Sequence, residues 1–332
     1  MEPIVSSQIK HQWRPYKLAS KGATAYHNAV VNAHYYVESL DKLANMVCRK
    51  IRDGDIVVDF GAGTGVSALH LLKRLKASIR LWLVDNSPAW LGKAYEVFSN
   101  NPNVECFLLE KKDDRYATLA ETVGEESVDH VVSANTVHLI PDLEDAFKGI
   151  YSALKPRGSF TFQSGNIMRK GRKNGVLMID DTVKRVHEMA MEIVNKSKRF
   201  VGYRKNIDDK AEKDRQRQII FPDPRPLEYY LKILKNACFD YGKPYFMDLR
   251  IAYKDWMRFL KVRRLQAGIL PEVGGKDPSP QEEKDRDDLI TMATNQLFDE
   301  LQNQNPMADE KSFTVELISV RAFKGYPAKL RF

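Results

Sequence analysis

The sequence predicts an α/β fold in which strands and helices alternate around a mostly parallel β-sheet. Short apolar runs rich in β-branched residues alternate with amphipathic helical segments between residues 51 and 165, and a glycine loop directly follows the first of these runs. The 332 residues are 43% hydrophobic and 29% charged, which is a globular composition. One elaborated domain with insertions is therefore expected.

The first half of the chain contains five predicted strands with helices between them. The strands are expected at 55–60, 79–85, 104–110, 128–134 and 158–165, and the helices at 66–76, 87–100 and 142–156. A further helix, with Leu40, Leu43 and Val47 on one face, precedes them and ends before the turn sequence RDGD. Such alternation implies right-handed crossovers that build a parallel sheet.

After Gly165 the alternation is interrupted twice. A long amphipathic helix runs through Ile179, Val186 and Ile193, and a charged stretch follows it. Core-like segments return as a helix at 224–239, for which Pro226 suits the first helical position, and as strands at 244–253 and 313–323. The predicted division is a helical N-terminal cap (1–50), a core (51–165), a basic helical insertion (166–225), a continuation of the core (226–253), a second helical insertion (254–311), and a last core strand with the tail (312–332).

Charge and cysteine content exclude several classes. The net charge is +8, and residues 169–217 hold 15 lysines and arginines against 8 acidic residues. No run approaches the roughly 18 apolar residues of a membrane span, and the first residues lack the apolar core of a signal peptide, so the cytoplasm is the expected compartment. Cys48, Cys106 and Cys238 form no CxxC pair, which argues against a disulfide framework or a zinc site, and no metal is expected.

The glycine loop IVVDFGAGTG, residues 56–65, is the most informative stretch. A dinucleotide fingerprint would need a small residue at the position of Val66, and a phosphate loop would need a following Lys-Ser/Thr pair. Neither is present. What remains is Asp59, two residues before the first of three alternating glycines, with a second acid, Asp85, closing the next strand.

This pattern resembles the class I S-adenosylmethionine-dependent methyltransferases, whose first motif is matched by VVDFGAGTG. The order of elements also resembles their Rossmann-like, seven-stranded sheet with an antiparallel last strand. The resemblance implies S-adenosylmethionine as cofactor, a role for Asp59 in orienting its amino end, and ribose binding by Asp85. The implied cofactor-binding residues of the loop and its neighbours are Asp59, Gly61, Ala62, Gly63, Gly65, Asp85, Asn86 and Ser133. Because this cofactor is a sulfonium cation without phosphate, carboxylates suit its site.

Two further cofactor contacts follow from the resemblance. An acid after the third strand would approach the adenine; Glu110, Asp113 and Asp114 are available, and Asp113 is favoured, with a solvated charged loop as the alternative. The segment GATAYHNAVVNAHYY resembles the N-terminal helix that covers the cofactor, where Tyr26 is the candidate aromatic contact. Ordinary core packing is the alternative for Tyr26.

The candidate catalytic residue is His138, in the segment SANTVHLIPD after the fourth strand. A neutral imidazole can accept a proton from a nucleophile near pH 7, so His138 is a candidate base or orienting group. The alternative is a histidine with a satisfied structural hydrogen bond. A carboxylate or phenolate acceptor would need no base at all.

The acceptor is expected to be a small molecule. The Asn/Asp-Pro-Pro-Tyr/Phe segment of enzymes that methylate base amino groups is replaced by SANT, and no cysteine sits in a C5-methylation motif. The first insertion lies where small-molecule members build a lid, and its basic residues suggest an anionic acceptor on an O, N or C atom. An RNA methyltransferase that uses this basic segment, or a non-catalytic cofactor-binding partner subunit, are the alternatives.

Overall fold

The computed structural model describes residues 12–17, 19–207, 210–304 and 311–325. Its central sheet has the order β3-β2-β1-β6-β7-β13, in which the first five strands are parallel and β13 is antiparallel to β7. The strands are β1 (Ile56–Phe60), β2 (Arg80–Asp85), β3 (Val104–Leu108), β6 (Val128–Ala134), β7 (Leu154–Ser164) and β13 (Ser312–Phe323). The predicted fold class is confirmed.

The edge beyond β13 is made of short pieces. The strand β12 (Tyr245–Ala252) pairs with the first part of β13, and β11 (Asp240–Tyr241) pairs with its end, both antiparallel. The two-residue β9 (Val176–Leu177) adds a parallel bridge to the start of β13. In β12, Met247, Leu249 and Ile251 are buried while the residues between them are exposed, as the alternating pattern predicts.

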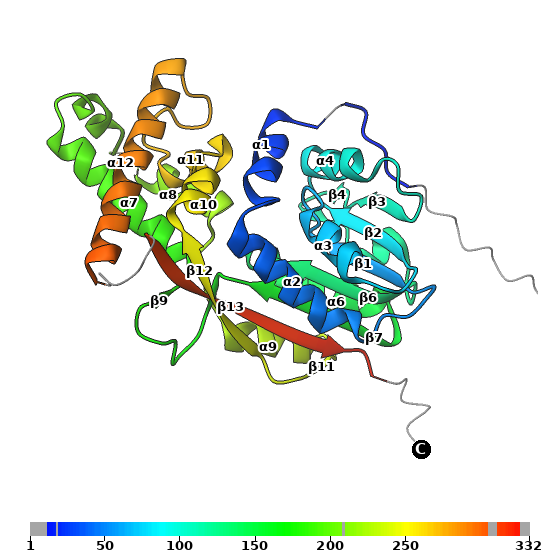
Figure 1. The fold of residues 1–332 in the computed structure, drawn as a ribbon. Helices are drawn as coiled ribbons and strands as arrows, with labels where there is room; N and C mark the ends of the chain where they lie inside the picture. Colours follow the sequence, from blue (N-terminus) through cyan, green and yellow to red (C-terminus); the bar gives the residue numbers. More distant parts are fainter. Residues whose placement is uncertain (1–11, 18, 208–209, 305–310, 326–332) are drawn as a thin grey trace, which may run out of the picture.

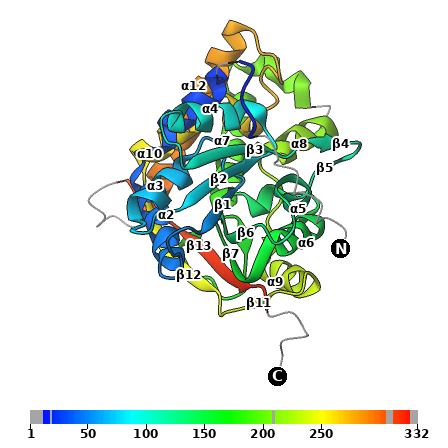
Figure 2. The same cartoon turned by 90° about the vertical axis from the view of Figure 1, so that its right-hand side faces the viewer.

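Helices cover both faces of the sheet (Figure 2). Strand β1 is buried throughout, and its alternation sends Val57 into one apolar cluster and Val58 into the other. The Val57 face packs against α2 (His34–Cys48), α3 (Val66–Arg74) and α4 (Pro88–Phe98), and the Val58 face against α5 (Leu119–Val123), α6 (Leu143–Ala153) and α9 (Leu227–Asn236). Apolar residues recur on one side of each helix because a helical period of 3.6 presents them to the sheet.

The two insertions come together as one helical unit, which Figure 1 shows beside the sheet. This helical unit consists of α7 (Ile179–Lys196), η2 (Val201–Ile207), α8 (Lys210–Ile220), α10 (Tyr253–Leu260), α11 (Arg263–Ile269) and α12 (Pro280–Gln304). Helix α7 packs along α12, and α8 packs against α11. The short α1 (Lys21–Val30) contacts both α10 and α4, so it connects the helical unit to the sheet domain.

Several local features differ from the expectation. Pro226 is the N-cap of α9 with extended backbone (ψ 148°), and Arg225–Pro226 (β10) pairs with Ile167–Met168 (β8). The helix therefore begins at Leu227, one residue after the position predicted as the first helical one. A small hairpin of β4 (Lys111–Lys112) and β5 (Arg115–Tyr116) follows β3, and a 3-10 turn, η1 (Val137–Leu139), follows β6. These elements are too short to produce a periodic signal in the sequence.

Among the described residues, no helix is long and apolar enough to cross a membrane. The three cysteines are free.

Candidate functional site

A cavity of about 680 Å³ lies at the carboxyl ends of the parallel strands. Strand β1 has β2 on one side and β6 on the other, so the strand order reverses there, which is where ligands bind in open α/β sheets. The glycine loop, the ends of β2 and β6, α1, α2 and the helical unit all contribute to the wall. Core and insertions therefore line one continuous space that is partly open to solvent.

Glycine is favoured at each of the three loop positions for a physical reason that the structure shows. All three have positive φ, at 73° for Gly61, 55° for Gly63 and 81° for Gly65. A Cβ on Gly61 would lie 2.1 Å from the Thr136 side chain, and one on Gly65 would lie 2.9 Å from the Phe98 ring. A Cβ on Gly63 would make only ordinary contact, 3.7 Å from Trp90, so there it is the backbone conformation that favours glycine.

Asp85 connects the end of β2 to the glycine loop. One carboxylate oxygen accepts a hydrogen bond from the Gly63 N–H at 2.8 Å, and the other accepts one from the Ser87 N–H at 2.8 Å. Burial raises the pKa of Asp85, and these backbone donors oppose the shift. Asp85 and Asn86 line the cavity, so the same carboxylate both supports the loop and faces the ligand space.

Asp59 lies beneath the loop. Its side chain is 1% exposed and is absent from the cavity wall, whereas the neighbouring Gly61, Ala62 and Gly63 line it. Oδ2 accepts a hydrogen bond from the Ser67 hydroxyl at 2.5 Å, and Oδ1 has no hydrogen-bond partner among the described residues. Burial raises the pKa of Asp59 to about 7. A buried carboxylate with one unpartnered oxygen fits a loop that receives a cationic ligand, because a nearby cation favours the ionised form.

The three candidate acids after β3 differ in their position relative to the cavity. Asp113 is exposed at the turn of the β4–β5 hairpin with φ 51°, whereas Asp114 lines the cavity. Glu110 is exposed and absent from the wall. Among the three, Asp114 is therefore the acid that faces the ligand space, and the sequence offered no means to choose because the hairpin turn decides it.

Tyr26 and His27 of α1 face the loop differently. Tyr26 lines the cavity, and its ring centroid is 4.6 Å from that of Trp90 in an edge-on arrangement. The His27 Nδ1 lies 3.2 Å from the Thr64 carbonyl oxygen in a buried contact that holds α1 on the loop. Ser133 is fully buried, its side chain makes no hydrogen bond among the described residues, and it is absent from the cavity wall.

His138 lies on η1 and lines the cavity. Its Nδ1 shares a 2.9 Å hydrogen bond with the Ser164 hydroxyl, which also accepts a bond from the Asn166 N–H at 3.0 Å. Burial lowers the pKa of His138 to about 4, and the charge of Arg225 adds to this shift. The ring is therefore neutral near pH 7, with a structural bond at one nitrogen.

Sequence reasoning missed several residues of the wall. Tyr35, Trp90, Asn135 and Arg264 all line the cavity. Asn135 has φ 52°, a left-handed conformation that asparagine tolerates. Its place directly after a predicted strand was the feature of the sequence that could have indicated a residue of the cavity wall. Arg264 comes from α11, far along the chain, and no local pattern indicates its placement.

The described basic residues of the first insertion do not line the cavity. In the described part of residues 169–217, none of the lysines or arginines lines the wall, and several pair with carboxylates elsewhere. Arg169 and Arg172 contact Glu316, and Arg199 contacts Asp285. The insertion instead contributes Asn166, Ile179 and residues 219–221 to the wall. The described cations of this insertion therefore provide no partner for an anionic acceptor in the cavity.

Comparisons with known proteins agree with this geometry. Residues 57–158 match a family model described as a methyltransferase domain. Over 132 residues the chain is 26% identical to the non-reducing polyketide synthase esdpA of Penicillium shearii, and this match covers 39% of the chain and 6% of that protein.

Solved structures share the fold at low identity. A Galdieria sulphuraria protein provisionally assigned as a sarcosine dimethylglycine methyltransferase has a TM-score of 0.51 and 12% identity, with 92% of this chain and 99% of that one covered. The YcgJ protein of Bacillus subtilis has a TM-score of 0.50 and 16% identity, with 87% of this chain and 99% of that one covered.

Proposed function

We propose that the protein is a class I S-adenosylmethionine-dependent methyltransferase that methylates a small molecule bound in the 680 Å³ cavity; the match of residues 57–158 to a methyltransferase domain supports this. The observation that carries this proposal is the continuity of the cavity. It extends from the glycine loop to a wall made by both insertions, and a ligand of small-molecule size fits a space of this volume.

The residues present fit the cofactor. Asp85 and Asn86 would hold the ribose end, the backbone of Gly61 to Gly63 would receive the methionine end, and Tyr26 with Asp114 would contact other parts of it. The unpartnered oxygen of Asp59 would favour its positive charge from beneath the loop. When bound, the cofactor supplies a methyl group already activated by its sulfonium.

The protein's own contribution is mainly orientation. Holding the acceptor in line with the methyl group converts the transfer to an effectively unimolecular step, and the enclosing helices exclude water. His138, neutral at pH 7 and facing the cavity, would accept a proton from a hydroxyl or amine acceptor or orient it through its bond to Ser164.

The test combines binding with product analysis. Calorimetry should show a single site that binds either S-adenosylmethionine or S-adenosylhomocysteine. Incubation with methyl-labelled cofactor should then place the label on small molecules of a metabolite extract and leave added RNA unlabelled. Label on RNA, or cofactor binding without transfer to any extract component, would contradict the proposal.

A further inference from the structure

The cavity wall opposite the glycine loop is apolar and aromatic. The helical unit contributes Trp256, Phe259 and Leu265, and the edge strands contribute Leu249, Val315 and Leu317. Apolar side chains continue to the surface, since Tyr116, Leu139 and Ile219 also line the cavity although they are 46%, 45% and 63% exposed. Large exposed apolar groups gathered on one cavity mark a path for an apolar ligand.

The cations on the wall are committed elsewhere. Arg115 bonds through both terminal nitrogens to Glu121, on the hairpin side. Arg264 lies over the Trp90 ring at 5.3 Å, and its charge acts on Asp85, on the side of the glycine loop. An anionic acceptor placed among Trp256, Leu249 and Leu317 would therefore lose its hydration without gaining a cationic partner, which is strongly unfavourable.

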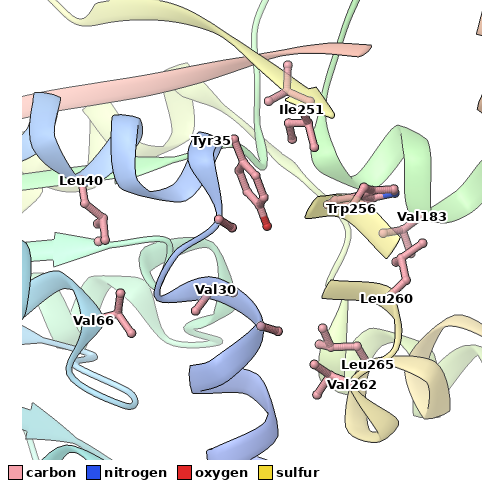
Figure 3. Close-up of a cluster of buried hydrophobic side chains, with 14 of the residues drawn as sticks. Val30, Tyr35, Leu40, Val66, Val183, Ile251, Trp256, Leu260, Val262 and Leu265 are labelled. Carbon is pink, nitrogen blue, oxygen red and sulfur yellow. The ribbon is translucent and has the colours of Figure 1, made fainter. Parts of the chain in front are cut away.

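Tyr35 adds a polar group to this part of the wall. Tyr35 of α2 is 5% exposed and lines the cavity. Figure 3 shows its hydroxyl directed into the space that faces Trp256, Leu260 and Leu265. No hydrogen bond joins this hydroxyl to another group in the described part of the chain. Burial raises its pKa, so the group is a neutral phenol that can donate one hydrogen bond.

We propose that the methyl acceptor is a neutral, predominantly apolar small molecule with one group that accepts a hydrogen bond from Tyr35. This inference rests on the proposed function, because it concerns the acceptor part of the same cavity. It replaces the anionic acceptor suggested by the basic insertion, whose described cations do not line this space.

A matched pair of probes tests the charge preference. 2-Naphthol and 2-naphthoate share a ring system and differ in charge at pH 7. In calorimetry with saturating S-adenosylhomocysteine, 2-naphthol should bind at least ~10-fold more tightly than 2-naphthoate. Equal affinities, tighter naphthoate binding, or no binding of 2-naphthol would overturn the inference. A protein that fails to bind S-adenosylhomocysteine would instead refute the proposed function, so the two failures are distinguishable.

Substitution of the anchor tests its role. Tyr35→Phe should weaken 2-naphthol binding by roughly 3- to 10-fold, the usual effect of one neutral hydrogen bond, and leave the affinity for S-adenosylhomocysteine unchanged. The control is Tyr253→Phe in α10, whose hydroxyl donates to Asn295 outside the cavity. Unchanged 2-naphthol affinity in Tyr35→Phe, or an equal loss in both variants, would contradict the assignment of Tyr35 as the anchor.

Discussion

Glycine is favoured in the loop for two reasons, close contact with a neighbouring side chain and a left-handed backbone conformation. Substitution of Gly61 and of Gly63 should separate the energetic costs of the two. Gly61→Ala places a methyl group 2.1 Å from Thr136 and should destabilise the fold by roughly 3 kcal/mol or more. Gly63→Ala meets only Trp90 at 3.7 Å and should cost about 1–2 kcal/mol, the strain of a left-handed alanine. Urea unfolding of both variants measures the difference, and equal losses would show that steric closeness at Thr136 is unimportant.

Asp85 should be required for cofactor binding for two reasons. Its carboxylate faces the cavity, and it accepts the Gly63 and Ser87 N–H bonds that shape the loop. Asp85→Ala should weaken S-adenosylhomocysteine binding by about 10- to 100-fold or more, since each charge-assisted hydrogen bond contributes about 1.5–3 kcal/mol. The control is Asp53→Ala, which removes an acceptor of the Ser78 N–H far from the cavity. Wild-type affinity of a folded Asp85→Ala protein in calorimetry would refute this role.

Asp59 should make the stability of the ligand-free protein depend on pH. Its pKa is about 7 in the folded chain and near its ordinary value of ~3.9 when unfolded, so the unfolded state loses this proton first as pH rises. The free energy of unfolding should fall by up to about 1.4 kcal/mol per pH unit between pH 4 and pH 7. Asp59→Asn removes this contribution. Denaturant melts at pH 5 and pH 7 should therefore favour the variant at the higher pH, and a parallel response of both proteins would be the contrary result.

At the scale of elements, sequence periodicity could predict what is periodic. The strand at 128–134 and the alternation through Met247, Leu249 and Ile251 agree with the structure, because each depends on burial repeated along the chain. The hairpin turn that separates Asp113 from Asp114 depends on backbone conformation at single residues, which no periodicity records. The association of α7 with α12 depends on tertiary packing between distant segments, which sequence periodicity does not predict either.

Because α7 packs against α12, the two insertions form one structural unit and not two separate ones. The predicted lid, residues 166–225, buries Val186, Met189 and Ile193 of α7 within an apolar cluster that also contains Leu289 and Leu297 of α12. Met189→Ala should therefore destabilise the protein by about 2–5 kcal/mol and increase hydrogen exchange in α12 as well as α7. Met292→Ala, at a 43% exposed position of α12, is the control and should cost less than about 0.5 kcal/mol. Exchange that rises in α7 alone would mean that the insertions open independently.

Over the whole molecule, the positive charge is large but locally balanced. Most of the net charge of +8 arises in residues 169–217. Several cations of this segment each contact two carboxylates: Arg199 contacts Asp285 and Asp288, Arg217 contacts Asp214 and Glu272, and Lys184 contacts Asp180 and Asp223. Paired cations release few counterions when a polyanion approaches, because their carboxylate partners repel it. The distribution of charge therefore argues against an RNA-binding surface more strongly than its sum argues for one.

This balance leads to a prediction about RNA. Filter binding of the intact protein to a mixed-sequence RNA should give only non-specific affinity at 150 mM salt, with a dissociation constant of about 10⁻⁴ to 10⁻⁶ M. Replacement of Arg199 and Arg217 by Gln should change that affinity little, since both side chains are already paired with acids. A dissociation constant well below 10⁻⁶ M, with a steep loss on raising salt and a further loss in the double variant, would show that the basic insertion binds nucleic acid. In that case the acceptor would be sought on RNA, and the apolar wall around Trp256 would need another ligand.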